Sequence, residues 1–400
     1  MSEASAGPLA GVKVLELGTL IAGPLCARML GDFGAEVIKI EAPDGGDQLR
    51  QWRKMHEGTS LWWYVQARNK KSVALNLRAP EGQEIVRKLA REVDIVIENF
   101  RPGALEKWNI GWSRLSAVNP RLVMVRLSGF GQDGPYRDRP GFGVVAESMG
   151  GMRYVTGYPE RPPVRLGISI GDSIAALHGV IGAMMALHHR NVNGGRGQYV
   201  DVALYEAVFN MMESLIPEYD VLGFKRERAG NELPGITPSN TYATRDGKFV
   251  IIGANNDSIF KRLTTVMGRV DLANDPSLAT NAGRVPRARE LDQAIETWTK
   301  EHDLDAVLDM LERAEVPSGR VYDAEDIVND VHYAARKVIE QWRLPDGTSM
   351  KIPGVVPKLS ETPGATRWLG PTLGAHTAEI LSALGYDEAQ QRDLKTRGVI

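Results

Sequence analysis

Residues 12–41 read VKVLELGTLIAGPLCARMLGDFGAEVIKIE, and this stretch decides the fold. Val12–Leu17 and Glu36–Glu41 are short and rich in Val, Leu and Ile, which predicts two strands. Between them, Leu25–Phe33 has helical spacing, with Pro24 at its start and Gly34 after its end. A strand, a helix and a second strand of these lengths form a βαβ unit, and its two strands are parallel.

The same alternation continues along the first half of the chain. Further strands are expected at Asp94–Ile97, Arg121–Leu127 and Gln198–Ala203. Helices are expected at Pro80–Glu92, 104–108 and 112–118, and a largely apolar helix is expected after Gly171. Strands that alternate with helices predict an α/β fold with a doubly wound, mostly parallel, Rossmann-like sheet.

The pattern changes after Leu222. Residues 224–238 resemble a linker, and 240–252 predict a hairpin around an Asp-Gly turn. Helices follow at about 257–267, 288–302 and 305–314. We therefore expect a large Rossmann-like domain at 1–222, a small α+β domain at 223–325, and a C-terminal part at 326–400 that returns to the large domain.

The composition excludes several classes of protein. The 400 residues carry a net charge of −2, which argues against a nucleic-acid binder with a dominant basic face. Cys26 is the single cysteine, so the chain cannot form an internal disulfide, and no metal-binding motif is present. No apolar run reaches about 18 residues, and the first residues do not form a signal peptide, so we expect a cytoplasmic protein outside the membrane.

Two motifs carry open alternatives. Residues 129–134 match G-x-G-x-x-G, but two prolines follow where a dinucleotide-binding loop needs a helix. A plain turn and a glycine loop that approaches a ligand are equally good interpretations. The basic residues Arg50, Arg53, Lys54, 68–71 and Arg78, with Trp52 and 62–64 among them, form either solvated surface or an anion site.

The stretch LGISIGDSIAALHG at 166–179 places Asp172 between a strand-like run and an apolar helix. Aspartate is a favoured helix N-cap, so Asp172 has a structural interpretation. A carboxylate at the start of a helix is also held ionised there and can react. Gly167 and Gly171 leave room for a ligand to approach the backbone.

Several motifs together resemble the class III CoA-transferases, a family that includes formyl-CoA, carnitine and dicarboxylate CoA-transferases. The matching segments are 9–17, 22–24, 30–41, 69–72, 98–103, 128–135, 171–172, 195–198 and 373–377. The resemblance implies that Asp172 is the nucleophile and forms an acyl anhydride and then an aspartyl-CoA thioester. It also implies an interlaced homodimer and no permanently bound cofactor, with coenzyme A and acyl-CoA as substrates.

By the same resemblance, CoA is bound by residues of several loops. They are Thr19, Leu20, Ile21, Ala22, Leu75, Arg78, Asn99, Phe100 and Lys107. Arg50, Trp52 and Arg68 are candidates to bind the acyl group. Since guanidinium binds carboxylate in a bidentate way, the arginines favour a small dicarboxylic acid as acceptor. The resemblance to dicarboxylate CoA-transferases implies succinyl-CoA as donor.

Some positions depart from the family pattern. Gly143 stands where many relatives carry an acidic residue, and Ala42 stands where formyl-CoA transferases carry a basic contact. No glycine-rich lid lies between Glu232 and Val250, which argues against oxalate as acceptor, and His376 is expected to be structural. A 2-methylacyl-CoA racemase is an alternative, but its histidine would fall at Phe142; a non-catalytic CoA-binding protein is another.

Overall fold

The computed structural model describes residues 7–400, and the chain divides into two compact units. The large unit holds the chain up to Arg153, Leu166–Pro217 and Lys337–Ile400. The small unit holds Tyr154–Arg165 and Glu218–Arg336. These bounds differ from the expected 223–325, because the small unit starts earlier, ends later and takes in a short excursion before Leu166.

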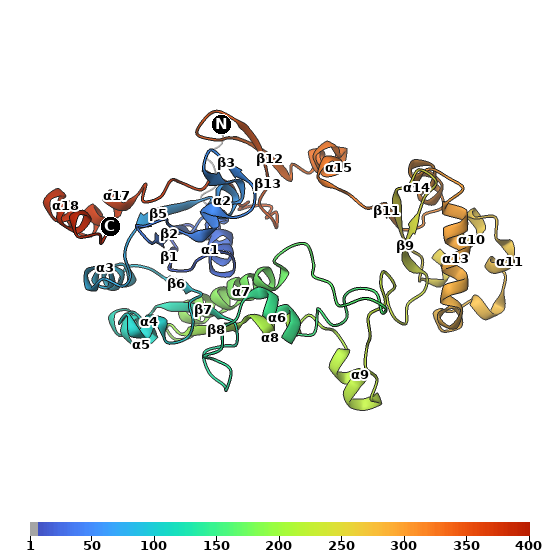
Figure 1. The fold of residues 1–400 in the computed structure, drawn as a ribbon, viewed down its shortest axis with the longest axis horizontal. Coiled ribbons are helices and arrows are strands. Elements are labelled where there is room, and N and C mark those ends of the chain that lie inside the picture. The colour runs from blue at the N-terminus through green and yellow to red at the C-terminus, as the bar shows by residue number, and fades with distance from the viewer. Residues whose placement is uncertain (1–6) are drawn as a thin grey trace. The chain divides into compact units, whose positions relative to one another are not determined.

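The large unit is built on a six-stranded parallel sheet (Figure 1). Its strand order is β5-β2-β1-β6-β7-β8, and all neighbours pair in parallel. The strands are β1 Lys13–Glu16, β2 Glu36–Glu41, β5 Lys70–Ala74, β6 Ile95–Glu98, β7 Val123–Ser128 and β8 Tyr199–Ala203. The doubly wound parallel sheet predicted from the sequence is confirmed.

Side chains alternate between the two faces of this sheet and build two cores. Val14 and Val125 face a core with α1 Ala22–Asp32 and α7 Ile170–Val192. Leu15 and Val96 face the other core, with α3 Pro80–Ala90. The same core includes α4 Ala104–Lys107, α5 Trp112–Val118, α17 Thr377–Ala383 and α18 Glu388–Thr396.

The C-terminal segment is joined to the sheet by hydrogen bonds at β5. Ser72 N donates to His376 Nδ1 (3.1 Å), and His376 N donates back to Ser72 O (2.9 Å). Ala74 N donates to Thr377 Oγ1 (2.9 Å). These contacts explain why the C-terminal residues belong to the large unit, and they give His376 the structural role that was expected.

Helix α7 is long and apolar enough to cross a membrane by length and composition alone. Ala175, Ala183 and Ala186 on this helix are buried in the core beside β7 and α1. A second stripe, with Leu177, Ile181 and Met185, is exposed. The burial of the first stripe is that of a core helix.

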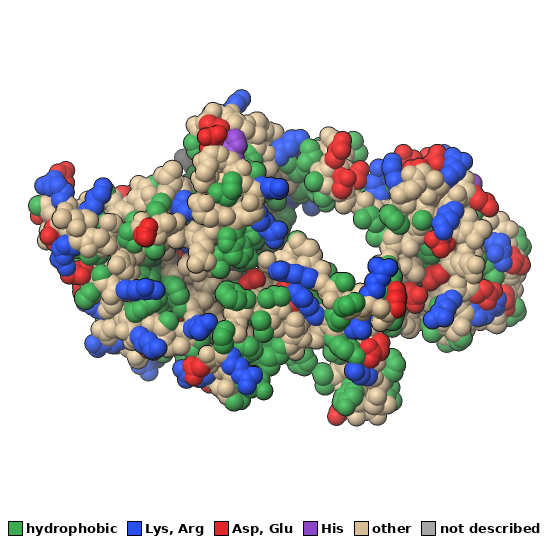
Figure 2. Space-filling model, viewed as in Figure 1, with side chains coloured by type: hydrophobic (Ala, Val, Ile, Leu, Met, Phe, Trp, Pro, Cys, Tyr) green, Lys and Arg blue, Asp and Glu red, His purple; other side chains and the backbone are tan. Residues whose placement is uncertain are grey.

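The small unit has a three-stranded antiparallel sheet in the order β11-β10-β9. The strands β9 Ser239–Ala243 and β10 Phe249–Gly253 form the predicted hairpin, with Ile251 opposite Thr241. The third strand is β11 Ser318–Arg320. Its main helices are α10 Asp257–Val266, α13 Ala288–Thr299 and α14 Leu304–Arg313. Figure 2 shows Lys and Arg side chains interspersed with Asp and Glu over this unit, in keeping with the low net charge.

The remaining short elements lie in connections. In the large unit they are η1 Gln48–Gln51, β3 Met55–His56, β4 Thr59–Ser60, α2 Leu61–Gln66, α6 Gly143–Met149, α8 Leu204–Phe209, β12 Ile339–Arg343 and β13 Ser349–Pro353. Helix α9 Leu215–Leu222 spans the boundary between the units. In the small unit they are α11 Val270–Ala273, η2 Pro276–Leu278, α12 Asn281–Arg284, η3 Val285–Arg287, α15 Ala324–Asn329 and α16 Val331–Ala335.

Candidate active site

The order in which the chain adds strands to the sheet reverses between β1 and β6. From β1 the chain winds outward to β2 and β5, and from β6 it winds the other way to β7 and β8. Open α/β sheets bind ligands beyond the carboxyl ends of the strands at this switch point. Here those ends lead into the loops 17–21 and 99–103, and a cavity of about 560 Å³ opens there.

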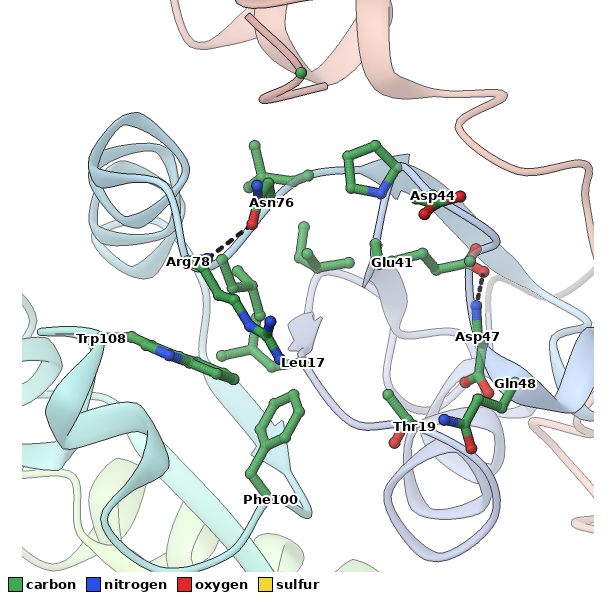
Figure 3. Close-up of a pocket in the computed structure, with 17 residues that line it drawn as sticks. Leu17, Thr19, Glu41, Asp44, Asp47, Gln48, Asn76, Arg78, Phe100 and Trp108 are labelled. Atoms are coloured by element: carbon green, nitrogen blue, oxygen red, sulfur yellow. Dashed lines mark hydrogen bonds between the residues drawn. The ribbon is translucent and has the colours of Figure 1, made fainter.

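The cavity is lined from several separate stretches of the chain (Figure 3). Phe100 and Trp108 pack edge to face, with ring centroids 5.1 Å apart, and the Arg78 side chain lies beside them. Among the described residues that line the cavity, Arg78 is the one Lys or Arg side chain. A guanidinium next to aromatic rings suits a ligand that joins phosphate groups to a planar ring.

The structure brings four of the nine predicted CoA-binding residues together in the lining of this cavity. Thr19, Leu75, Arg78 and Phe100 line the cavity. Asn99 supports the lining, since Thr19 N donates to its Oδ1 and its Nδ2 donates to Thr19 O, both at 2.8 Å.

The other predicted CoA contacts lie around this cavity. Leu20, Ile21 and Ala22 continue the Thr19 loop into α1 without lining it. Lys107 is exposed at the end of α4, next to Trp108. Ala42, noted above as a departure from the family pattern, also lines the cavity. Their roles toward CoA stay predictions.

Two carboxylates at the cavity wall are already paired with cations. Arg50 donates to both oxygens of Glu41, at 2.8 and 2.9 Å. Burial alone would raise the pKa of Glu41, but Arg50 and Lys39 hold it below its usual value. Asp47 pairs with Lys39 at 2.8 Å, and its pKa is lowered in the same way. The wall therefore repels an anionic ligand less than its composition suggests.

Asp172 lies in the first turn of α7, where it is half-buried. The N-cap of α7 is Ser169, so the prediction that Asp172 caps this helix is wrong. Residues 166–169 form no strand, and the strand-like run predicted there is also wrong. The carboxylate nevertheless sits at the positive end of a 23-residue helix, whose first N–H groups have no intrahelical acceptor.

The side chain of Asp172 lies against the start of α6. A Cβ atom placed on Gly143 would be 2.1 Å from Asp172 Oδ2, and one placed on Gly171 would be 3.0 Å from Gly143 O. The two helices therefore meet backbone to backbone beside the carboxylate. Helix α6 was not predicted, since Gly143 at its start and Gly150 at its end hid a short helix.

Beneath this contact lies a second carboxylate, which the sequence analysis missed. Glu147 is 1% exposed, and its Cγ is 3.2 Å from the Cβ position of Gly171. Its Oε2 is 3.4 Å from both Nε and Nη2 of Arg153, and its Oε1 has no hydrogen-bond partner. One feature of the sequence could have indicated Glu147. It lies four residues after Gly143, a spacing that places both residues on the same face of a helix.

The predicted acyl-binding residues fall into separate surroundings. Arg68 is 2% exposed, and it donates to both oxygens of Asp32 at 2.9 and 2.7 Å and to Pro353 O. Arg50 is bound by Glu41 and lies 3.7 Å over the Trp63 ring. Trp52 is 39% exposed. These contacts give both arginines a structural role, and their contact with substrate stays a prediction.

The glycine loop at 129–134 packs against the segment that leads into α6. A Cβ atom on Gly129 would lie 2.8 Å from Gly141 Cα. Gln132 N donates to Asp201 Oδ2 at 2.8 Å, which ties the loop to β8. No helix follows the loop, so it is not a dinucleotide-binding loop, as its prolines predicted.

Fold and site together define a doubly wound α/β protein with a cavity at the switch point of the sheet and a carboxylate at the start of a packed helix. Helix α1, which follows the Thr19 loop, packs directly against α7. Comparison with known proteins shows the family of the chain. The model of CoA-transferase family III matches residues 9–377, and the chain belongs to this family of transferases.

Several curated proteins similar to this chain are CoA-transferases that match it nearly from end to end. Succinyl-CoA–D-citramalate CoA-transferase of Chloroflexus aurantiacus is 51% identical over 98% of both chains. The beta subunit of succinyl-CoA–L-malate CoA-transferase from the same organism is 42% identical, again over 98% of both chains. Among solved structures, a CaiB/BaiF family protein from Brucella suis is 34% identical, with a TM-score of 0.83 over 94% of this chain and 99% of that one.

Proposed function

We propose that the enzyme transfers CoA from succinyl-CoA to a small dicarboxylic acid, with a hydroxydicarboxylate of the citramalate or malate type as acceptor. The 51% identity to a succinyl-CoA–D-citramalate enzyme, over nearly the whole of both chains, is the observation that carries the substrate class. A succinate–glutarate CoA-transferase at 34% identity widens the class to dicarboxylates without a hydroxyl group.

Asp172 is proposed as the nucleophile. Its carboxylate attacks the thioester carbonyl of succinyl-CoA, the C–S bond breaks, and CoA leaves as the thiolate from a mixed anhydride. The thiolate then attacks the aspartyl carbonyl, which releases succinate and leaves an aspartyl-CoA thioester. The acceptor carboxylate attacks this thioester, and CoA thiolate finally attacks the acceptor carbonyl of the new anhydride. This returns Asp172 as a carboxylate and consumes neither water nor electrons.

The surroundings of Asp172 support this role. The first turn of α7 offers N–H groups and the positive end of its dipole to the oxyanion that forms at each addition step. Gly143 and Gly171 remove side chains from the space beside the carboxylate, so an acyl group can reach it. The loops around Thr19 and Phe100 would hold the nucleotide part of CoA, with Arg78 on its phosphates.

We also propose that two copies form a homodimer, and the interlaced form stays part of this proposal. Leu177, Ile181 and Met185 recur at helical spacing on α7 and are 44%, 50% and 67% exposed. Val221 and Leu222 at the end of α9 are 76% and 74% exposed. Apolar stripes of this kind are typical of subunit contacts. A cytoplasmic location is proposed with it.

The mechanism is tested by trapping the intermediate. We expect the purified protein, incubated with succinyl-CoA and then with hydroxylamine, to carry a hydroxamate on the peptide that contains Asp172, read by mass spectrometry. Asp172→Asn should give no adduct and no transfer. Asp387→Asn, at the exposed N-cap of α18 where asparagine also caps, should behave as the wild type. An unmodified Asp172 during turnover would overturn the covalent mechanism.

The racemase alternative has its own test. Phe142, where the racemase histidine would fall, is the N-cap of α6 and offers no proton-transfer group. We expect no deuterium exchange at the α-carbon of a 2-methylacyl-CoA in heavy water. Exchange without CoA transfer would favour the racemase.

A further inference from the structure

The loop between β1 and α1, residues 18–21, contains a strained residue. Leu20 has a φ of +65°, in the left-handed region that residues with a Cβ atom rarely adopt. Strained residues persist where surrounding structure holds them, and they cluster at functional sites. This loop supplies Thr19 to the cavity wall, so the question is what holds Leu20 in place.

The direct contact comes from Asp47. Leu20 N donates to both carboxylate oxygens of Asp47, at 3.0 and 3.2 Å. Asp47 is 1% exposed and is itself fixed, because its N donates to Glu41 Oε2 at 3.0 Å and its Oδ1 accepts from Leu49 N at 2.9 Å. A rigid, ionised acceptor therefore faces the N–H group of the strained residue.

Behind Asp47 lies a group of charges that we call the buried charge cluster: Glu16, Lys39, Asp47 and Lys70. Lys39 Nζ contacts Glu16 Oε1 at 2.7 Å, Asp47 Oδ2 at 2.8 Å and Gly18 O at 2.9 Å. These three acceptors match its three N–H donors. Burial alone would lower the pKa of Lys39, but the carboxylates of Asp47, Glu16 and Glu41 raise it above its usual value, so Lys39 stays charged.

The second lysine of the cluster contacts the first turn of α1, which directly follows the loop. Lys70 Nζ contacts Glu16 Oε2 at 2.7 Å and donates to Pro24 O at 2.7 Å. All four cluster residues are at most 1% exposed. Two acids and two lysines balance in charge, so each buried ion of the cluster has a partner of opposite charge. The cluster thus reaches backbone atoms of Gly18, Leu20 and Pro24 from beneath the loop.

We infer that the buried charge cluster sets the conformation of the loop 18–21 for binding acyl-CoA, with Asp47 as a positioning residue that keeps Leu20 left-handed. This inference rests on the proposed function, because it assumes that CoA binds in the cavity beside this loop. The cluster forms before any ligand arrives, so the binding loop is ordered in advance and CoA does not have to order it.

The test is a comparison of two equally buried aspartates. Asp47→Asn removes the charge that Lys39 and Leu20 share. Asp32→Asn removes a charge that is 3% exposed and binds Arg68 through two short contacts, away from this loop. We expect Asp47→Asn to raise the Kd for CoA and the KM for succinyl-CoA at least 10-fold, with kcat within 3-fold. Asp32→Asn should lower the melting temperature similarly and leave the Kd for CoA within 2-fold.

Asp47 also lines the cavity, so it could contact CoA directly as well as position Leu20. Substitutions at Leu20 distinguish these two roles. Glycine adopts the left-handed conformation without strain, whereas alanine does not. We therefore expect Asp47→Asn with Leu20→Gly to bind CoA roughly 5-fold more tightly than Asp47→Asn with Leu20→Ala. Equal affinities of the two double variants would mean that Asp47 contacts CoA directly, and the positioning role would be overturned.

If Asp47→Asn does not fold, Asp47→Glu replaces it, with Asp32→Glu as its control. The longer side chain keeps the charge beside Lys39 and displaces the contact with Leu20. An unchanged Kd for CoA in Asp47→Glu would overturn the inference. A different result would overturn the proposed function. In that case the wild type would form no adduct at Asp172 with succinyl-CoA, whatever the Kd values of the variants for CoA.

Discussion

A Cβ atom on Gly143 would lie 2.1 Å from Oδ2 of Asp172 and 2.8 Å from its carboxyl carbon. The carboxylate of the proposed nucleophile thus occupies the space that any side chain at position 143 would need. This relationship gives a physical reason for glycine at this position. It also ties the orientation of the nucleophile to one residue on another helix.

Gly143→Ala should therefore impair catalysis while leaving the fold intact. The clash falls on the mobile end of the Asp172 side chain, so the carboxylate turns away and the backbone stays. Misplacing a reacting group by about 1 Å costs on the order of 100-fold in rate. We expect kcat to fall about that much, with a melting temperature close to the wild type. Steady-state kinetics and differential scanning fluorimetry measure both.

Gly167→Ala is the matched control for this substitution. Gly167 precedes the same helix, has no atom within 4 Å of its Cβ position, and has no left-handed backbone. Its kcat should stay within 2-fold of the wild type. Equal losses of kcat in Gly143→Ala and Gly167→Ala would contradict this explanation. They would mean that catalysis is sensitive to any added side chain near the start of α7, and not to the position of the Asp172 carboxylate.

Arg78 offers a test of the cavity as the CoA site. Removing its guanidinium should cost a charge-assisted hydrogen bond to phosphate, about 1.5–3 kcal/mol, or roughly 10- to 150-fold in KM for succinyl-CoA. We expect a much smaller change in kcat for Arg78→Ala. Arg91→Ala, exposed just after the same helix α3, should leave KM unchanged. Competition by dephospho-CoA and CoA would show which phosphate Arg78 contacts.

We expect Arg153 to be a better candidate than Arg68 for binding the free carboxylate of a dicarboxylate substrate. Its contacts to Glu147 are 3.4 Å long, and its side chain is 23% exposed, whereas Arg68 makes contacts below 3 Å and is 2% exposed. Contacts from Arg153 to Glu147 and from Glu147 to Gly171 connect it to the residue before Asp172.

For Arg153→Gln we expect kcat/KM for succinyl-CoA to fall roughly 10- to 100-fold. Butyryl-CoA, which lacks the second carboxylate, should lose less than 3-fold. Arg121→Gln, at an exposed arginine that donates to Gly195 O, serves as the control. A loss of the same size for both thioesters would assign Arg153 to the support of Glu147 instead.

The sequence sufficed for most of the sheet because hydrophobic periodicity reports burial, and β1, β2, β6 and β7 are buried on both faces. Strand β5 was not predicted because it starts with Lys70 and Lys71, and lysines in sequence indicate a surface position. Lys70 is buried only because Glu16, from β1, lies next to it. Such a pairing across three strands of the sheet cannot be found from local spacing.

The site shows the same division. Thr19, Leu75, Arg78 and Phe100, which the family resemblance named as CoA contacts, line one cavity because they follow strand ends. Their contact with CoA stays a prediction. Arg50 and Arg68 were chosen for their charge, but their partners Glu41 and Asp32 lie 9 and 36 residues away and take up that charge. Glu147 was missed because its burial depends on α6, a helix between glycines that had no clear pattern.

Glu98 gives the protein a pH dependence that can be measured. Burial raises the pKa of this carboxyl to about 7, although Arg126 at 2.8 Å opposes the shift. Between the unfolded pKa near 4.5 and about 7, the folded protein holds the proton that the unfolded chain has lost. Glu98 therefore contributes stability below pH 4.5 that is lost as the pH rises through 7. A one-unit shift is about 1.4 kcal/mol, so we expect a decrease on the order of 1–3 kcal/mol between pH 4.5 and 7.5.

Glu98→Gln should remove this dependence, since glutamine keeps the shape and cannot titrate. Chemical unfolding at pH 5 and pH 7.5 measures the difference for both proteins. Between these two pH values, the free energy of unfolding of the wild type should fall by about 1–3 kcal/mol more than that of the variant. The same variant should weaken CoA binding only modestly, because Glu98 Oε2 accepts from Phe100 N at 2.8 Å and glutamine can still accept there. Parallel pH profiles for the two proteins would place the pKa of Glu98 in its ordinary range and show that the pairing with Arg126 outweighs its burial.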